Sequence, residues 1–367
     1  MQLNTEINSL AKLSIKNIGH IGTAEIFIDK STSIAGHNNI GKSTITKILF
    51  SIIKAEKTSR EFYLEFINDY NKTDSIKEKQ LLKYNFEEEY SLGTVTDLNT
   101  FENTLKMRLY KKYLVKYFFS TLGENYLRET TQNGKILFSH NNFSLEFLIS
   151  KNKPIEINLS GKYAWYTDAT LISSTEVLNF SNLINNADTA IDEKYNLTKL
   201  VSAQEKDLIE KLNKVFADML DDNFKPLNGL YFDKYGYAFY KENSKTVDVK
   251  VLGTGKKLFA IMDRLVVNKS INQSTLLLLD EPEEGMHPEW QLDFIEFLLK
   301  SKIPFMLTTH SPYIIQSLVH YTKNSNKIYY YTIEYLLEKG FAICNKEDKP
   351  LKIVKDLTNP MLKVRGF

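Results

Sequence analysis

The stretch Gly36-His-Asn-Asn-Ile-Gly-Lys-Ser-Thr44 decides the fold of this chain. It fits the pattern G-x-x-x-x-G-K-[ST] of a phosphate loop, in which backbone N–H groups surround the oxygens of a triphosphate. An apolar strand is predicted before the loop, over Thr32–Ala35, and an apolar helix after it, over Thr44–Ile53. Because the positive end of a helix dipole attracts anions, the stretch and its flanks together predict nucleotide binding.

Two side chains of this loop have distinct predicted roles. Lys42 supplies a mobile ammonium to the outer phosphates, and the Ser43 hydroxyl is suited to bind Mg²⁺. The sequence therefore predicts a nucleotide and Mg²⁺ as cofactors. The other loop residues expected to contact the nucleotide are Gly36, Asn38, Asn39, Gly41 and Thr44.

The composition is that of a globular protein. The chain has 367 residues, of which 43% are hydrophobic, enough for one large domain or a core with an insertion. A net charge of +2 does not by itself argue for nucleic-acid binding. The single cysteine, Cys344, excludes an intramolecular disulfide and suits a reducing compartment. With no signal peptide after Met1 and no apolar stretch of membrane-spanning length, we expect a cytoplasmic protein that does not bind membranes.

The hydrophobic pattern predicts an α/β core interrupted by a helical insertion. Residues 58–141 are rich in Tyr, Phe, Lys and Glu at helical spacing, whereas 1–57 and 142–367 carry the strand patterns and the motifs. A long amphipathic helix is expected over Leu197–Leu220. Strands are predicted at 13–18, 24–28, 143–149, 155–159, 162–166, 230–240, 246–251, 275–279 and 304–307, with helices from about 256 and 289 and after 312, and a closing hairpin at 327–335 and 341–344.

Two acidic residues follow an apolar strand in the C-terminal third. The stretch Thr275-Leu-Leu-Leu-Leu-Asp-Glu281 predicts a buried strand that ends in two carboxylates, at the edge where a parallel sheet presents its ligands. Asp280 can hold Mg²⁺ through water, and Glu281 can accept the proton of an attacking water molecule.

Two further stretches extend this predicted site. Glycines and a hydroxyl at Gly253-Thr-Gly255 open a helix, which makes Thr254 and Gly255 a candidate anion site for a nucleotide held by another protomer. The stretch Pro304-Phe-Met-Leu-Thr-Thr-His310 predicts a strand that delivers His310 next to the phosphates. A neutral imidazole at that place can bond the terminal phosphate or the water.

In this order, these stretches resemble the ATP-binding-cassette type of ATPase head, and within it the OLD-like and AAA-type ATPases of bacterial anti-phage defence systems such as Septu, PARIS and certain retrons. The resemblance implies that Gly36–Thr44 is the Walker A loop and Leu276–Glu281 the Walker B strand with its catalytic glutamate. It makes Leu252–Lys256 the signature, Glu284–Pro288 the D-loop and His310 the switch histidine. The signature departs from the transporter form Leu-Ser-Gly-Gly-Gln, since glycine stands where serine is expected.

The resemblance implies an ATP hydrolase with ATP and Mg²⁺ as cofactors, acting as a homodimer or higher homo-oligomer. The leading hypothesis is that it controls a separate effector, a nuclease or toxin. A DNA-repair or chromosome-maintenance ATPase head is the alternative, although the sequence between Lys42 and Asp280 lacks the sustained heptads of a long coiled coil. A transporter subunit would carry the Leu-Ser-Gly-Gly-Gln signature. An OLD nuclease would carry a catalytic domain after His310, and the residues that follow His310 are too few for such a domain.

Nucleic acid is a further candidate partner because of one basic segment. Lys106-Met-Arg-Leu-Tyr-Lys-Lys-Tyr-Leu-Val-Lys-Tyr117 interleaves basic and aromatic residues, which can grip phosphates and stack on bases. The same pattern also fits a helix whose Leu and Tyr face a core while Lys and Arg face water, or a surface that docks an acidic partner.

Overall fold

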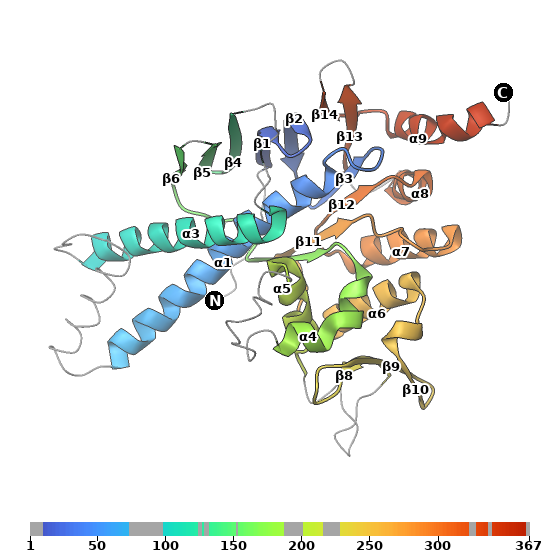
Figure 1. Ribbon diagram of the computed structural model, residues 1–367, viewed down its shortest axis with the longest axis horizontal. Helices are drawn as coiled ribbons and strands as arrows, with labels where there is room; N and C mark the ends of the chain where they lie inside the picture. Colours follow the sequence, from blue (N-terminus) through green and yellow to red (C-terminus); the bar gives the residue numbers. More distant parts are fainter. Residues whose placement is uncertain are drawn as a thin grey trace.

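The computed structural model describes residues 10–72, 98–123, 127, 132–151, 153–186, 201–215, 228–322, 328–336 and 340–364. Among these residues, one large mixed sheet forms the framework of the molecule (Figure 1). Its order is β6-β5-β4-β1-β2-β14-β13-β3-β12-β11-β7. The strands are β1 (Ala11–Ile18), β2 (Ile21–Ile28), β3 (Ser31–Ala35), β4 (Asn133–His140), β5 (Phe143–Ser150), β6 (Lys153–Ser160), β7 (Asp168–Ile172), β11 (Thr275–Asp280), β12 (Phe305–Thr309), β13 (Tyr329–Leu336) and β14 (Phe341–Lys346).

The sheet has an antiparallel half and a parallel half. Strands β6, β5, β4, β1 and β2 pair antiparallel in succession, whereas β13, β3, β12, β11 and β7 pair parallel. The carboxyl ends of β3, β11 and β12 therefore lie at the same edge. The phosphate loop follows β3, Asp280 ends β11, and Glu281 comes directly after it. The topology therefore brings the phosphate loop and the two carboxylates together at one edge of the sheet.

Helices cover both faces of the parallel half. The helices of the described chain are α1 (Lys42–Lys72), α3 (Leu98–Leu122), α4 (Ser181–Asn186), α5 (Ala203–Leu212), α6 (Thr254–Val267), α7 (Pro288–Ser301), α8 (Pro312–Thr322) and α9 (Pro350–Val364), of which α3 packs against β5 of the antiparallel half. Strand β11 shows why two layers are needed, because it is apolar on both faces. Leu276 and Leu278 belong to the core that contains α1, whereas Leu277 and Leu279 belong to the core that contains α6, α7 and α8.

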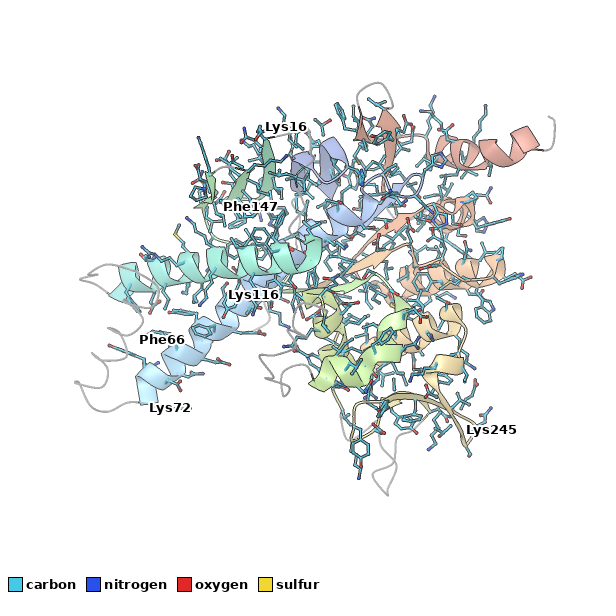
Figure 2. The ribbon with its side chains drawn as sticks, viewed as in Figure 1. Lys16, Phe66, Lys72, Lys116, Phe147 and Lys245 are labelled. Carbon is cyan, nitrogen blue, oxygen red and sulfur yellow. The ribbon has the colours of Figure 1, made fainter. Side chains whose placement is uncertain are left out.

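The helices α1 and α3 lie side by side and project beyond the sheet (Figure 1). A small aromatic and leucine cluster joins them, in which the rings of Phe66 and Phe101 lie 5.8 Å apart. Figure 2 shows Phe66 pointing into the space between the two helices. Each helix therefore buries an apolar stripe against the other.

A smaller unit lies next to α6. It contains the three-stranded sheet β10-β9-β8, built from β8 (Gly229–Phe232), β9 (Ala238–Glu242) and β10 (Lys245–Asp248). The short 3-10 helices η1 (Thr175–Phe180) and η4 (Val249–Val251) flank it. The unit packs on α6, whose first turn carries Thr254 and Gly255.

The expected α/β class with a mixed sheet is confirmed, but several boundaries differ from the sequence-based prediction. Residues 162–166 are not a strand, since Trp165 and Tyr166 fill the core from an irregular segment before β7. The predicted strand 230–240 is the hairpin of β8 and β9, and the predicted strand 246–251 ends as the 3-10 helix η4. Within the expected helix Leu197–Leu220, α5 covers Ala203–Leu212, and residues 197–200 and 216–220 lie outside the described part.

The structure describes part of the helical insertion predicted over 58–141. Its start falls in the middle of α1, which runs unbroken from Lys42 to Lys72. Near its end lies β4, which pairs with β1 and β5 in the main sheet. Within the predicted insertion, Leu98–Leu122 form the helix α3, as expected, and residues 73–97 lie outside the described part of the chain. We propose that the helical insertion ends before β4 and that the core resumes there.

Candidate active site

The phosphate loop leaves β3 through a close backbone contact. The N–H of Gly36 donates to the Thr309 carbonyl at 3.1 Å, which anchors the start of the loop to β12. A Cβ on Gly36 would lie 2.5 Å from the Ile333 carbonyl oxygen, so no side chain fits there. Further along, Asn39 and Gly41 have φ of 60° and 103°. Such left-handed residues give the sharp turns that an anion-binding nest requires.

Lys42 is almost completely buried beneath this loop, with 2% of its side chain exposed. Its ammonium donates to the carbonyls of Gly36 and His37 at 3.0 and 2.6 Å. It also lies 2.8 Å from Oε1 of Glu281, which follows β11. The structure therefore unites two sequence motifs that are far apart in the chain. Among the other predicted loop contacts, Asn38 and Asn39 lie on the exposed rim, and Ser43 and Thr44 form the first turn of α1.

Asp280 and Ser43 converge at the start of α1. The Asp280 carboxylate accepts hydrogen bonds from the Ser43 hydroxyl and from Thr308 Oγ1, the latter at 2.5 Å. Burial raises the pKa of Asp280, and the hydrogen bonds from Thr308 and Ser43 oppose that rise. A hydroxyl and a carboxylate at this place are the protein ligands that a phosphate loop offers to Mg²⁺, so the residues fit the ion predicted from the sequence.

Glu281 adopts an uncommon backbone conformation. Its φ is 51°, in the left-handed region that a non-glycine residue rarely occupies. Its N–H donates to the Thr308 carbonyl at 3.1 Å, which holds the turn against β12. Backbone strain of this kind is found at functional sites, where surrounding contacts keep it in place. Here the turn leaves the carboxylate 29% exposed and beside Lys42.

His310 directly follows β12 and lies near two carboxylates of the turn after β11. Its Nδ1 is 3.7 Å from Glu281 Oε2 and 3.3 Å from Glu283 Oε1. Neither contact is a hydrogen bond, and Nδ1 has no hydrogen-bond partner in the structure. The imidazole is 41% exposed, so it is open to solvent beside Glu281.

The remaining predicted nucleotide contacts, Thr254 and Gly255, lie at the start of α6 and not in the phosphate loop. Thr254 and Gly255 begin α6 and pack against the turn that follows Glu281. A Cβ on Gly285 would lie 2.8 Å from Thr254 Cβ, and one on Gly255 would lie 2.8 Å from the Trp290 ring. The predicted signature and the predicted D-loop are therefore neighbours within one chain.

Sequence reasoning missed two residues that shape the site. Thr308 binds both Asp280 and the backbone of Glu281, and Glu283 contacts the segment that carries His310. The only sequence signal for Thr308 was its place at the end of the strand before His310. For Glu283 it was the acidic run after Asp280, which also fits an ordinary solvated turn.

The basic and aromatic segment of α3 turns its tyrosines inward. Tyr110 is buried against Phe143, with ring centroids 6.1 Å apart, and Tyr117 packs edge-on against Phe50 at the same separation. Lys112 and Lys116 are exposed (Figure 2 labels Lys116). The rings are thus engaged in packing, which is the arrangement of a helix with a solvated basic face.

No group of three or more His, Cys, Asp or Glu in the described part of the chain could hold a metal ion by itself. None of the helices in the described ranges has the length and apolar character to cross a membrane.

Comparison with known proteins places the chain among ATPase domains. A family described as "AAA domain, putative AbiEii toxin, Type IV TA system" matches residues 31–316. The curated protein "Endonuclease GajA" from Bacillus cereus (strain HuB5-5) is 26% identical over 421 residues, which cover 89% of this chain and 60% of the relative. The chain thus spans less than two thirds of that relative's length.

The matching solved structures include heads of SMC proteins. The SMC head domain from Thermotoga maritima matches with a TM-score of 0.43 and 13% identity, over 92% of this chain and 99% of that one. The Smc head from Pyrococcus furiosus, bound to the C-terminal domain of ScpA, matches with a TM-score of 0.46 and 11% identity, over 95% and 99%.

Proposed function

Because the chain belongs to this AAA-domain family of P-loop ATP hydrolases, we propose that it hydrolyses ATP at the edge where β3, β11 and β12 end. The family confirms the resemblance seen in the motifs. The observation that carries the assignment of the site is the 2.8 Å contact between Lys42 and Glu281. It joins the group suited to bind phosphate to the group suited to accept a proton.

Each side chain of the site has a proposed role. Lys42 binds the outer phosphates, and Ser43 with Asp280 holds Mg²⁺. When bound, Mg²⁺ neutralises charge that develops on the phosphate oxygens. Glu281 takes the proton of the attacking water, and His310 lies close enough to orient that water. The loop residues Gly36, Asn38, Asn39, Gly41 and Thr44 surround the phosphates with backbone and side-chain donors.

We propose that two copies of the chain complete each site. Thr254 and Gly255 form a helix N-terminus, which favours an anion, and they pack beside Gly285 and not in the phosphate loop. In a dimer they would face the nucleotide of the partner copy. The surroundings of Gly253 support a partner's nucleotide at this turn. Apart from its chain neighbours, no heavy atom lies within 4 Å of the position that a Cβ on Gly253 would take, so the turn before α6 is open there.

We further propose that ATP turnover controls an effector in anti-phage defence. An ATP-closed dimer differs from an open one by rigid-body movement, which a bound protein can sense. The curated relative is called an endonuclease, which supports a link between this type of ATPase and nucleic-acid cleavage. For this chain we propose that the nuclease or toxin is a separate protein.

The test is the turnover of Glu281→Gln. Removing the positioned base should lower kcat by ~10²–10⁴-fold, while ATP binding is retained because Lys42 and Asp280 remain. The ATP-bound dimer should then accumulate and be visible by light scattering. Lys42→Ala should instead lose ATP binding, as measured by calorimetry.

A matched control is Glu296→Gln on α7, whose carboxylate pairs with Lys300 one turn away. It removes the same charge at the surface and should keep the parent kcat. Full turnover in Glu281→Gln would show that the carboxylate is assigned wrongly.

A further inference from the structure

Glu283 is a buried carboxylate for which the chemistry proposed above has no use. It lies in the turn after β11, two residues beyond Glu281, and 3% of its side chain is exposed. Burying a carboxylate is costly unless hydrogen bonds replace its water. The partners of Glu283 therefore indicate what the residue does.

A single oxygen of Glu283 accepts three hydrogen bonds. Oε1 accepts from Thr309 Oγ1 at 2.6 Å, from the His310 N–H at 2.8 Å and from the Ser311 N–H at 3.2 Å. These donors come from consecutive residues, where β12 ends and α8 is about to begin at Pro312. The carboxylate thus fixes the backbone from which the His310 side chain extends.

The histidine has little else to hold it in place. Its ring is 41% exposed, and Nδ1 lies 3.3 Å from the same Oε1 without a hydrogen bond. Because no hydrogen bond fixes Nδ1, the place of the ring beside Glu281 follows from the position of the backbone that carries it. A misplacement of about 1 Å in a catalytic group can cost ~10²-fold in rate.

A second hydrogen-bond chain ties the same segment to the turn after β11. Ser311 Oγ donates to Gln291 Oε1 at 2.6 Å, and Gln291 Nε2 donates to the Met286 carbonyl at 3.2 Å. Both ends of this chain are buried. The turn 283–286 and the segment 309–311 therefore form one hydrogen-bonded unit.

We propose that Glu283 is a positioning residue for His310. It acts through its three hydrogen bonds to 309–311, and this role rests on the ATPase site proposed above. Lys42 and Ser43 keep their own contacts when Glu283 changes, so the effect falls on turnover and not on ATP binding.

The experiment compares two substitutions of similar size. Glu283→Leu removes the acceptor and should lower kcat by ~10²-fold with the KM for ATP unchanged. Glu283→Gln keeps an acceptor oxygen for these donors and should retain most of the turnover. A residue that only supported the fold would lower the melting temperature without this split between kcat and KM.

A double-mutant cycle then tests the route through His310. In a His310→Gln background, Glu283→Leu should lower kcat no further, because the group that it positions is gone. An independent loss in that background, or parent kcat in Glu283→Leu alone, overturns the proposal.

If Glu283→Leu fails to fold, Thr309→Val removes one of the three donors and enters the same cycle. It should lower kcat less than the leucine variant would, again only when His310 is present. Glu281→Gln is measured alongside. Full turnover in Glu281→Gln would reject the proposed ATPase site itself. Loss of turnover in Glu281→Gln, with no effect of the substitutions at Glu283 or Thr309, would reject only the positioning role of Glu283.

Discussion

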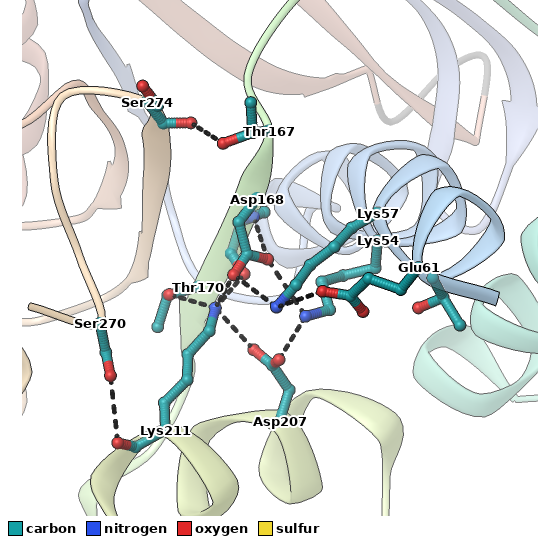
Figure 3. Close-up of polar contacts among 12 residues, drawn as sticks. Lys54, Lys57, Glu61, Thr167, Asp168, Thr170, Asp207, Lys211, Ser270 and Ser274 are labelled. Carbon is teal, nitrogen blue, oxygen red and sulfur yellow. Dashed lines mark hydrogen bonds and ion pairs between the residues drawn. The ribbon is translucent and has the colours of Figure 1, made fainter. Parts of the chain in front are cut away.

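Lys54 and Asp168 form an ion pair in the interior, with 3.1 Å between Nζ and Oδ1 (Figure 3). Lys54 lies on α1, about 18 Å along the helix from Lys42 at 1.5 Å per residue. Asp168 begins β7, and the pair is joined by Asp207 and Lys211 of α5. The cluster therefore fastens the helix of the phosphate loop to the edge of the sheet and to α5.

We expect this cluster to be needed for folding. Asp207→Ala should destabilise the protein by about 3–5 kcal/mol, because it leaves Lys54 and Lys211 buried with less compensating charge. Urea unfolding measures the change. Glu210→Ala on the exposed face of α5 is the control and should change stability by less than about 0.5 kcal/mol. Equal effects of the two substitutions would contradict the buried role of Asp207.

The same cluster predicts how stability depends on pH. Burial opposes ionisation of Asp168, but Lys211, Lys54 and Lys57 more than offset it and hold the pKa of Asp168 well below its usual range. A carboxyl with a lowered folded pKa stabilises the fold above its unfolded pKa, about 3.9, and this stabilisation is lost as the pH falls further.

Lys54 acts at the other end of the pH range. Burial lowers its pKa, but Asp207 and Asp168 raise it above the ordinary value. Its contribution is therefore complete below the unfolded pKa of about 10.4 and is lost as the pH rises through the folded value. Burial lowers the pKa of Lys211 in the same cluster, which opposes the effect of Lys54 at high pH. Melting temperatures measured across pH should therefore fall most clearly at the acid end, and Asp168→Asn should flatten that acid limb. An acid limb as steep as that of the parent would contradict this assignment.

The basic face of α3 should not grip single-stranded nucleic acid by stacking. Its tyrosines pack inward, so Lys111→Glu with Lys112→Glu should leave any affinity for DNA or RNA unchanged. Gel-shift assays at low and high salt provide the measurement. A complex that weakens steeply with salt and disappears in the double variant would instead support phosphate contacts on this helix.

The purified chain should hydrolyse ATP without cutting nucleic acid. This follows from the proposal that the effector is a separate protein, since the proposed catalytic groups all surround one phosphate loop. The assay is cleavage of DNA and RNA with Mg²⁺ or Mn²⁺, with Glu281→Gln as the control, followed by copurification with the product of an adjacent gene. Robust cutting by the chain alone would reject a separate effector and favour a nuclease of the OLD type.

Local sequence predicted the main elements of the site because each depends on short-range geometry. The loop from Gly36 to Thr44 needs its glycines and lysine at fixed spacing, and the apolar run before Asp280 can only be a buried strand or a helix segment too short to stand alone. Strand β7 and helix α9 were missed. Strand β7 has only a short apolar run, and α9 lies beyond the last motif.

By itself, the sequence determined that a phosphate loop, two carboxylates and His310 would gather at one sheet edge, because parallel strands present their carboxyl ends together. The tertiary structure alone decided which atoms meet, at this edge and elsewhere in the core. The three bonds to Glu283 and the pairing of Lys54 with Asp168 join residues distant in the chain. Such contacts depend on strand order and on how helices cross the sheet, which local spacing does not encode.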